Sequence, residues 1–105
     1  MTKVVVKAGA CGFTSVIRAD KGRERSVDIS VDSGCAMVQK MAAEISSLGR
    51  RDALSGLLTN PVYLAAARHL KHAACPVPSA VLKALEVEAG LNVKKDATIV
   101  FEEEG

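Results

Sequence analysis

The sequence predicts an α+β domain in which helices cover one face of a mostly antiparallel sheet. Short β-branched and alternating segments fill the first third of the chain, segments with helical spacing follow, and one more β-branched segment lies near the end. This segregation favours an α+β fold over a parallel α/β fold, in which strands and helices alternate. We expect three strands, three or four helices and a C-terminal strand in a single domain over residues 1–105.

The first three segments have strand patterns. Val4–Ala8 is mostly β-branched, and Phe13–Ala19 follows it after a turn that contains two glycines. In Arg25–Asp32, valine and isoleucine alternate strictly with serine and aspartate, which is typical of a strand with one buried face. Asp20–Arg23 is the expected turn between the second and third strands.

The pattern then changes to a helical period. After Ser33 and Gly34, apolar residues recur at the spacing of one helix face, and Asp32 or Ser33 can cap this helix. Gly49 is its expected end. The stripe consists of Met37, Met41, Ile45 and Leu48.

Local signals divide the rest of the chain. Residues 50–58 predict a short helix, and Asn60 followed by Pro61 is a cap and first-turn signal for a helix that runs to Ala74. Prolines at 76 and 78 interrupt the helical pattern, and a last helix is expected from Ser79 to Gly90. Ala97–Phe101 predicts a strand, and three glutamates follow it.

Composition excludes several classes of function. The 105 residues are 49% apolar and 25% charged, which is typical of one globular domain. A net charge of +2 and an aromatic content of 3% provide neither the basic surface nor the stacking side chains of a nucleic-acid-binding protein. No apolar run is long enough for a signal peptide or a membrane span, so we expect a cytoplasmic protein without membrane or nucleic-acid partners.

Three cysteines lie at junctions between the expected elements. Cys11 is in the glycine-containing turn, Cys35 begins the first helix, and Cys75 separates two helices. In a reducing cytoplasm, three cysteines point to metal binding, redox chemistry or simple burial rather than to disulfides. Cys35 in the first helical turn would meet backbone N–H groups that favour a thiolate. We predict that folding gathers the three sulfurs into one pocket.

Soft thiolate ligands select zinc, copper(I) or iron–sulfur clusters. Three thiols are one ligand short of a closed site, and His72 or His69 could supply the fourth. Water or a substrate atom could do so instead.

The order of elements, together with Ala10-Cys11-Gly12, Gly34-Cys35 and a third cysteine before the last helix, resembles the iron–sulfur cluster scaffold proteins of the IscU and NifU N-terminal family. The resemblance covers about residues 8–90 and depends more on topology than on residue identity. It implies that Cys11, Cys35 and Cys75 hold a [2Fe–2S] cluster or a zinc ion. A cysteine desulfurase and cluster-acceptor proteins would then be the partners.

The chain departs from this family at several points. Phe13 stands where the family has an acidic residue two positions after its first cysteine, and Ala74 stands where scaffold members have a histidine. The family's N-terminal helix and its Leu-Pro-Pro-Val-Lys segment are absent from this sequence. The chain would therefore form a divergent branch.

The leading hypothesis is a non-enzymatic metal- or cluster-binding protein that uses Cys11, Cys35 and Cys75, with His72 as a further ligand. A second hypothesis makes Cys35 a nucleophile or persulfide carrier in sulfur transfer. A third makes the chain an interaction module with inert thiols. A homo-oligomer is compatible with each, since a second subunit can complete a three-thiol site.

Overall fold

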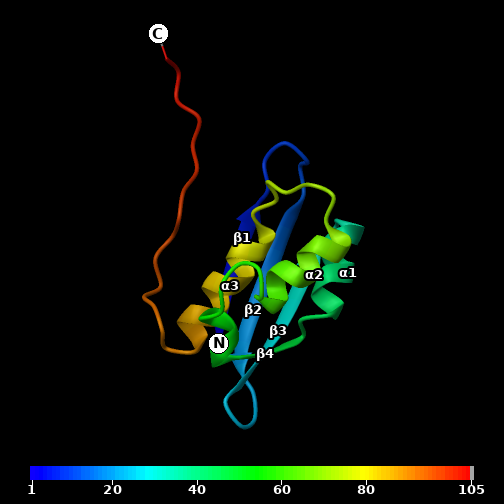
Figure 1. Ribbon diagram of the computed structural model, residues 1–105. Coiled ribbons are helices and arrows are strands. Elements are labelled where there is room, and N and C mark those ends of the chain that lie inside the picture. Colours follow the sequence, from blue (N-terminus) through cyan, green and yellow to red (C-terminus); the bar gives the residue numbers. More distant parts are fainter. Residues whose placement is uncertain (105) are drawn as a thin grey trace.

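The computed structural model describes residues 1–104 and is an α+β domain with one four-stranded antiparallel sheet and three α-helices (Figure 1). The strand order follows the chain, β1-β2-β3-β4. The strands are β1 (Thr2–Lys7), β2 (Thr14–Lys21), β3 (Ser26–Ser33) and β4 (Ser47–Gly49). The helices are α1 (Ala36–Ala43), α2 (Pro61–His69) and α3 (Val77–Glu88), with a short 3₁₀ helix, η1, at Arg50–Ala53.

The three predicted N-terminal strands are confirmed and form a meander. In β1 and β2, Val4 lies opposite Ile17, and in β2 and β3, Ile17 lies opposite Val31. The second turn lies later than predicted, because Asp20 and Lys21 still pair with β3. The chain reverses instead between Gly22 and Ser26, where the Gly22 N–H donates to the Ser26 carbonyl at 2.8 Å.

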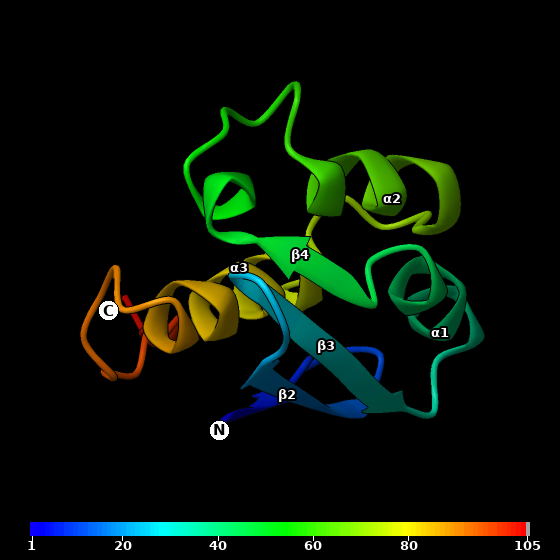
Figure 2. The same cartoon turned by 90° about the horizontal axis from the view of Figure 1, so that it is seen from below.

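The helices cover one face of the sheet, as expected. Strand residues that point toward the helices are buried, whereas their neighbours on the opposite face are exposed, so β2 alternates between the two environments. α3 packs on β1 and β2, α1 packs on β3, and α2 packs on α1 and α3. In Figure 2 all three helices lie on the same side of β2 and β3.

The core lies between this face and the helices. Its largest fully buried side chains include Ile17, Met41, Ile45, Val81 and Leu85. α3 is also tied to the sheet at its C-terminal end, where Glu88 accepts hydrogen bonds from the Thr2 hydroxyl at 2.7 Å and the Lys21 N–H at 3.0 Å. These bonds lower the pKa of Glu88, the Thr2 bond most of all.

The predicted helix up to Gly49 is wrong beyond residue 43. α1 ends at Ala43, and Ser47–Gly49 forms β4 beside the start of β3. Ile45 and Leu48 are still buried, as their apolar character requires. Spacing could not separate the two outcomes, because a turn followed by an edge strand buries the same two side chains as a continued helix.

The predicted start of α2 at Pro61, with Asn60 as its cap, is confirmed, but the other helix ends in this region differ from the prediction. Within residues 50–58 only η1 is helical, and α2 ends at His69 rather than at Ala74. α3 begins at Val77, because Pro76 occupies the cap and Pro78 the second helical position, where a missing N–H costs no hydrogen bond.

The predicted strand at Ala97–Phe101 is also wrong. Residues 91–104 contain no helix or strand. A strand exists only when another strand pairs with it, and no pairing of this segment occurs within the part of the chain that the structure describes. The fourth strand of the sheet is β4 instead. None of the helices in residues 1–104 is both long and apolar enough to cross a membrane.

Candidate thiol site

Three junctions of the fold meet at one end of the domain. They are the β1–β2 loop, the connection from β3 to α1, and the connection from α2 to α3, and they carry Cys11, Cys35 and Cys75 respectively. Figure 1 shows the β1–β2 loop and the α2–α3 connection close together at the end of the sheet opposite the N-terminus. The antiparallel meander produces this arrangement, since β1 ends, β2 begins and β3 ends at the same end of the sheet.

All three cysteines and His72 line a single cavity of about 530 Å³. The predicted common pocket is therefore present. Its other walls are mainly apolar and come from the three junctions, the start of β2, and the first turns of α1 and α3. The lining residues are Ala8, Ala10, Phe13, Ser15, Met37, Val38, Leu70, Ala74, Pro76 and Val77.

Cys35 occupies the best-defined position of the three. It is the N-cap residue of α1, with an extended backbone, rather than part of the first turn as predicted. The Cys35 N–H donates to the Ser33 hydroxyl at 3.1 Å, and that hydroxyl also accepts a 2.8 Å hydrogen bond from Ser15, which is buried. Ser33 therefore fixes the backbone at Cys35 rather than capping the helix. The Cys35 side chain is partly buried.

Cys11 is exposed on the β1–β2 loop. The loop is closed by a 3.1 Å hydrogen bond from the Ala8 N–H to the Phe13 carbonyl, and by a 2.9 Å bond from the Gly12 N–H to the Gly9 carbonyl. Both glycines have positive φ, +83° and +78°, which only glycine adopts at little cost. The glycines around Cys11 therefore shape the loop that carries it.

Phe13 separates the loop from the start of α1. Its ring lies against Gly34, where an added Cβ atom would come within 3.1 Å of the Phe13 Cδ1 atom. The sequence predicts Phe13 as the first residue of the second strand, but β2 begins at Thr14. Phe13 is 41% exposed and lines the cavity together with Cys35. An apolar ring therefore stands at the position where the resemblance would place a carboxylate.

Cys75 and His72 belong to the same turn. The Cys75 N–H donates to the His72 carbonyl at 3.1 Å, so the backbone between α2 and α3 folds back on itself before Pro76. His72 is exposed, whereas Cys75 is partly buried. Both side chains border the cavity.

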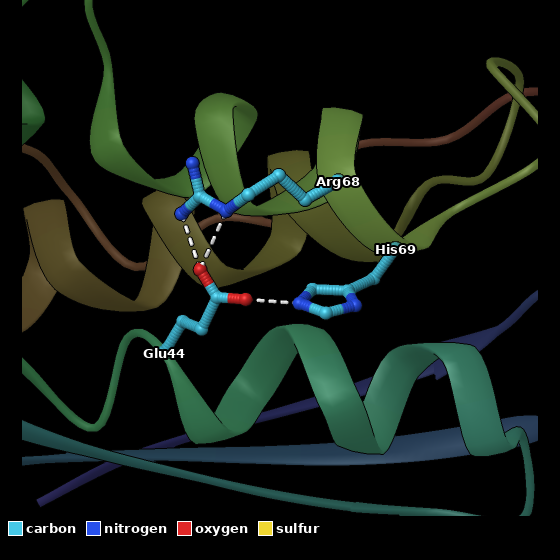
Figure 3. A network of polar contacts seen from close by, with 3 residues as sticks. All are labelled: Glu44, Arg68 and His69. Atoms are coloured by element: carbon cyan, nitrogen blue, oxygen red, sulfur yellow. Dashed lines mark hydrogen bonds and ion pairs between the residues drawn. The ribbon is translucent and has the colours of Figure 1, made fainter.

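His69, the other histidine considered as a ligand, lies away from the cavity. Its Nε2 atom contacts Glu44 at the end of α1, and Arg68 Nε donates to the same carboxylate at 2.7 Å (Figure 3). Hydrogen bonds from Arg68 and then from His69 lower the pKa of Glu44 below its ordinary value of 4.5. This network joins α1 to α2 and assigns His69 a structural role.

The side chains around the cavity do not form a finished metal site. Among residues 1–104, no three histidine, cysteine, aspartate or glutamate side chains converge closely enough to hold an ion. Thiolates that share one zinc ion lie about 4 Å apart. The fold thus collects four donor groups of the right chemistry around one space, without bringing them to ligand distance.

The sequence does not predict most of the residues that line the cavity. Met37 was assigned to the core stripe of the first helix, and the cavity positions of Val38 and Leu70 were not predicted. Their apolar character was visible, but it could not distinguish a residue in the core from one beside a cavity.

Comparison with known proteins places this fold and site in a family. The sequence profile of a family of unknown function, DUF6951, matches residues 2–101. The chain belongs to this family. Because the match spans every strand and helix, the sheet, the helices and the thiol cavity are all within the DUF6951 region. No curated protein and no solved structure matches the chain significantly.

Proposed function

We propose that this protein binds zinc or an iron–sulfur cluster of the [2Fe–2S] type through Cys11, Cys35 and Cys75, as a divergent relative of the IscU and NifU scaffolds. The single observation that carries the proposal is that the three cysteines, from three separate junctions, border one cavity together with His72. Soft thiolate donors suit both kinds of cargo.

Ligation requires the donors to move closer together than they are in the structure. A change of χ1 rotamer moves a cysteine sulfur by roughly 3 Å. Cys11 lies on an exposed loop and can adjust freely, whereas Cys35 and Cys75 both pack against the hydrophobic core, and the Ser33 hydroxyl holds the backbone at Cys35. In this proposal Cys35 and Cys75 stay near their positions, and Cys11 makes the larger movement toward the cargo.

The surroundings suit a cargo that is received and released. Phe13, Met37, Val38 and Leu70 give the cavity an apolar wall, while Cys11 and His72 are exposed. A partly open site permits exchange with a donor and an acceptor. By resemblance, the donor of sulfur would be a cysteine desulfurase, and the acceptors would be cluster-binding proteins.

Anaerobic purification followed by reconstitution with ferrous iron and sulfide, or with zinc alone, tests the proposal. We expect stoichiometric metal and, for the cluster, a sulfur-to-iron absorption band. Cys35→Ser, Cys11→Ser and Cys75→Ser should each weaken binding by more than about tenfold. The histidines form a matched pair: His72→Ala should weaken binding, whereas His69→Ala should not. A chain that takes up no metal, or a triple serine variant that binds as well as the native chain, would refute the proposal.

A second candidate is sulfur carriage by Cys35 as a persulfide. The absence of converged ligands among residues 1–104 favours it, since this chemistry needs one thiol rather than three. The Cys35 thiolate would attack the outer sulfur of a donor persulfide, form a new S–S bond and release the donor's thiolate, so no external oxidant is required. Alkylation separates the candidates: a carrier has one thiol that reacts fastest with or without metal, whereas a metal site protects all three thiols together.

A further inference from the structure

The segment Ala97–Phe101 has the composition of a strand but is not paired in the described structure. Threonine, isoleucine, valine and phenylalanine occur in succession, and these residues favour strands. Ile99 is 91% exposed and Phe101 is completely exposed. Contiguous apolar exposure of this kind is typical of a surface that binds a partner.

The path of the chain keeps this segment away from its own sheet. Asn92, Val93 and residues 95–97 lie beside Lys83, Glu86 and Val87 on α3. Beyond them, the red C-terminal part of the chain in Figure 1 runs alongside the domain without joining the sheet, and its end lies past the β1–β2 loop. The segment is therefore accessible to another molecule.

Among residues 1–104, β1 pairs only with β2, so the sheet has a free edge at β1 in this part of the chain. The register of the two strands continues to Ala8 and Phe13, where the Ala8 N–H donates to the Phe13 carbonyl. In an antiparallel ladder such hydrogen-bonded pairs alternate along the strand. It follows that Lys3, Val5 and Lys7 direct their backbone N–H and C=O groups away from β2, toward the open edge.

The charges of the edge and of the tail are complementary. Val5 is 53% exposed and lies between Lys3 and Lys7, which are exposed on the same face. Lysines on an edge strand oppose pairing with most other strands. The tail, however, continues as Glu102–Glu104, so its acidic end can neutralise them.

We propose that Ala97–Phe101 of one copy adds as a strand to the β1 edge of a second copy, and that the exchange is reciprocal in a symmetric dimer. Main-chain hydrogen bonds to Lys3, Val5 and Lys7 hold the added strand. Burial of Val5 against apolar tail residues contributes further stabilisation. The dimer is independent of metal or sulfur at the thiol cavity, which uses neither the β1 edge nor residues 98–104.

Sedimentation of the full chain over a wide concentration range tests the proposal. We expect a reversible dimer with twice the 11.0 kDa mass of one chain. Ile99→Asp should weaken dimerisation by at least about tenfold, and Leu58→Asp is the matched control because both side chains are 91% exposed. Neither substitution disturbs the core, and circular dichroism verifies that both variants fold.

Hydrogen exchange distinguishes a second copy from pairing within one chain. The amides of Lys3, Val5 and Lys7, and every second amide of residues 98–101, should be protected in the dimer and should lose protection on dilution to the monomer. A chain that stays monomeric at high concentration would overturn the proposal. So would a dimer that Ile99→Asp leaves intact, or protection of these amides in the monomer.

Discussion

Replacing Asn60 with alanine should strongly destabilise the fold, because this buried side chain connects the start of α2 to η1 and the segment that follows it. Asn60 is only 2% exposed. Its Oδ1 atom accepts from the Val62 N–H at 3.0 Å and caps α2, while its Nδ2 atom donates to the Asp52 carbonyl at 2.7 Å. A further 3.2 Å bond reaches the Ser55 hydroxyl.

The magnitude follows from these bonds. Loss of an N-cap side chain costs about 1 kcal/mol. Loss of the buried Nδ2 donor, which bonds to the Asp52 carbonyl at 2.7 Å and to the Ser55 hydroxyl at 3.2 Å, costs roughly 1 to 2 kcal/mol more. Asn60→Ala should therefore reduce the free energy of unfolding by about 2 to 3 kcal/mol, which for a domain of this size lowers Tm by roughly 10 to 20 °C.

Urea unfolding followed by circular dichroism measures this change. Asn60→Ser should recover about half of the loss, because a serine hydroxyl can cap the helix but cannot replace the amide donor. Asn92→Ala is the control: its exposed amide bonds to Glu86 at 2.9 Å, and its removal should change stability by less than about 0.5 kcal/mol. If Asn60→Ala cost no more than Asn92→Ala, the assigned role of the buried amide would be wrong.

Two further predictions concern the α1–α2 contact and the loop that carries Cys11. Arg68 and His69 lower the pKa of Glu44 in the folded state, so the Glu44 carboxylate stabilises the fold above pH 4.5, and this stabilisation is lost as the pH falls below that value. When the free energy of unfolding is measured against pH in acid, Glu44→Gln should remove this loss of stability. An unchanged pH profile in the variant would contradict the assigned role of Glu44. Gly12→Ala should cost about 1 kcal/mol because φ is +78°, whereas Gly56→Ala, which has no positive φ and no close neighbour, should be neutral in the same urea assay.

Much of the secondary structure was predictable because its causes are local. Strict alternation in residues 26–32 gave the third strand, and an amide cap before Pro61 gave the start of α2. The sequence predicts the end of a helix at Ser47–Gly49, where the structure has β4 instead. This strand was not predictable, because it depends on pairing with Ser26–Asp28, about twenty residues away. The unpaired state of Ala97–Phe101 is likewise a property of its neighbours rather than of its own residues.

The donor residues of the candidate site were predictable from the sequence, but the residues that line the cavity around them were not. Thiols at the ends of elements indicated a shared pocket, and Cys11, Cys35 and Cys75 do border one cavity. The sequence could not separate His72 from His69, because the choice depends on Glu44 holding His69 against α1. Nor could it predict that the thiols stop short of ligand distance.

The sequence by itself determined the first three strands, the start of α2, and which donor atoms the chain can offer. These properties depend on neighbouring residues and on side-chain chemistry alone. Only the tertiary structure decided which junctions meet, which histidine reaches the cavity, and that the β1 edge and the Ala97–Phe101 segment are both left unpaired among residues 1–104. Such relations arise from sheet order and helix packing, which bring together atoms that lie far apart in the chain.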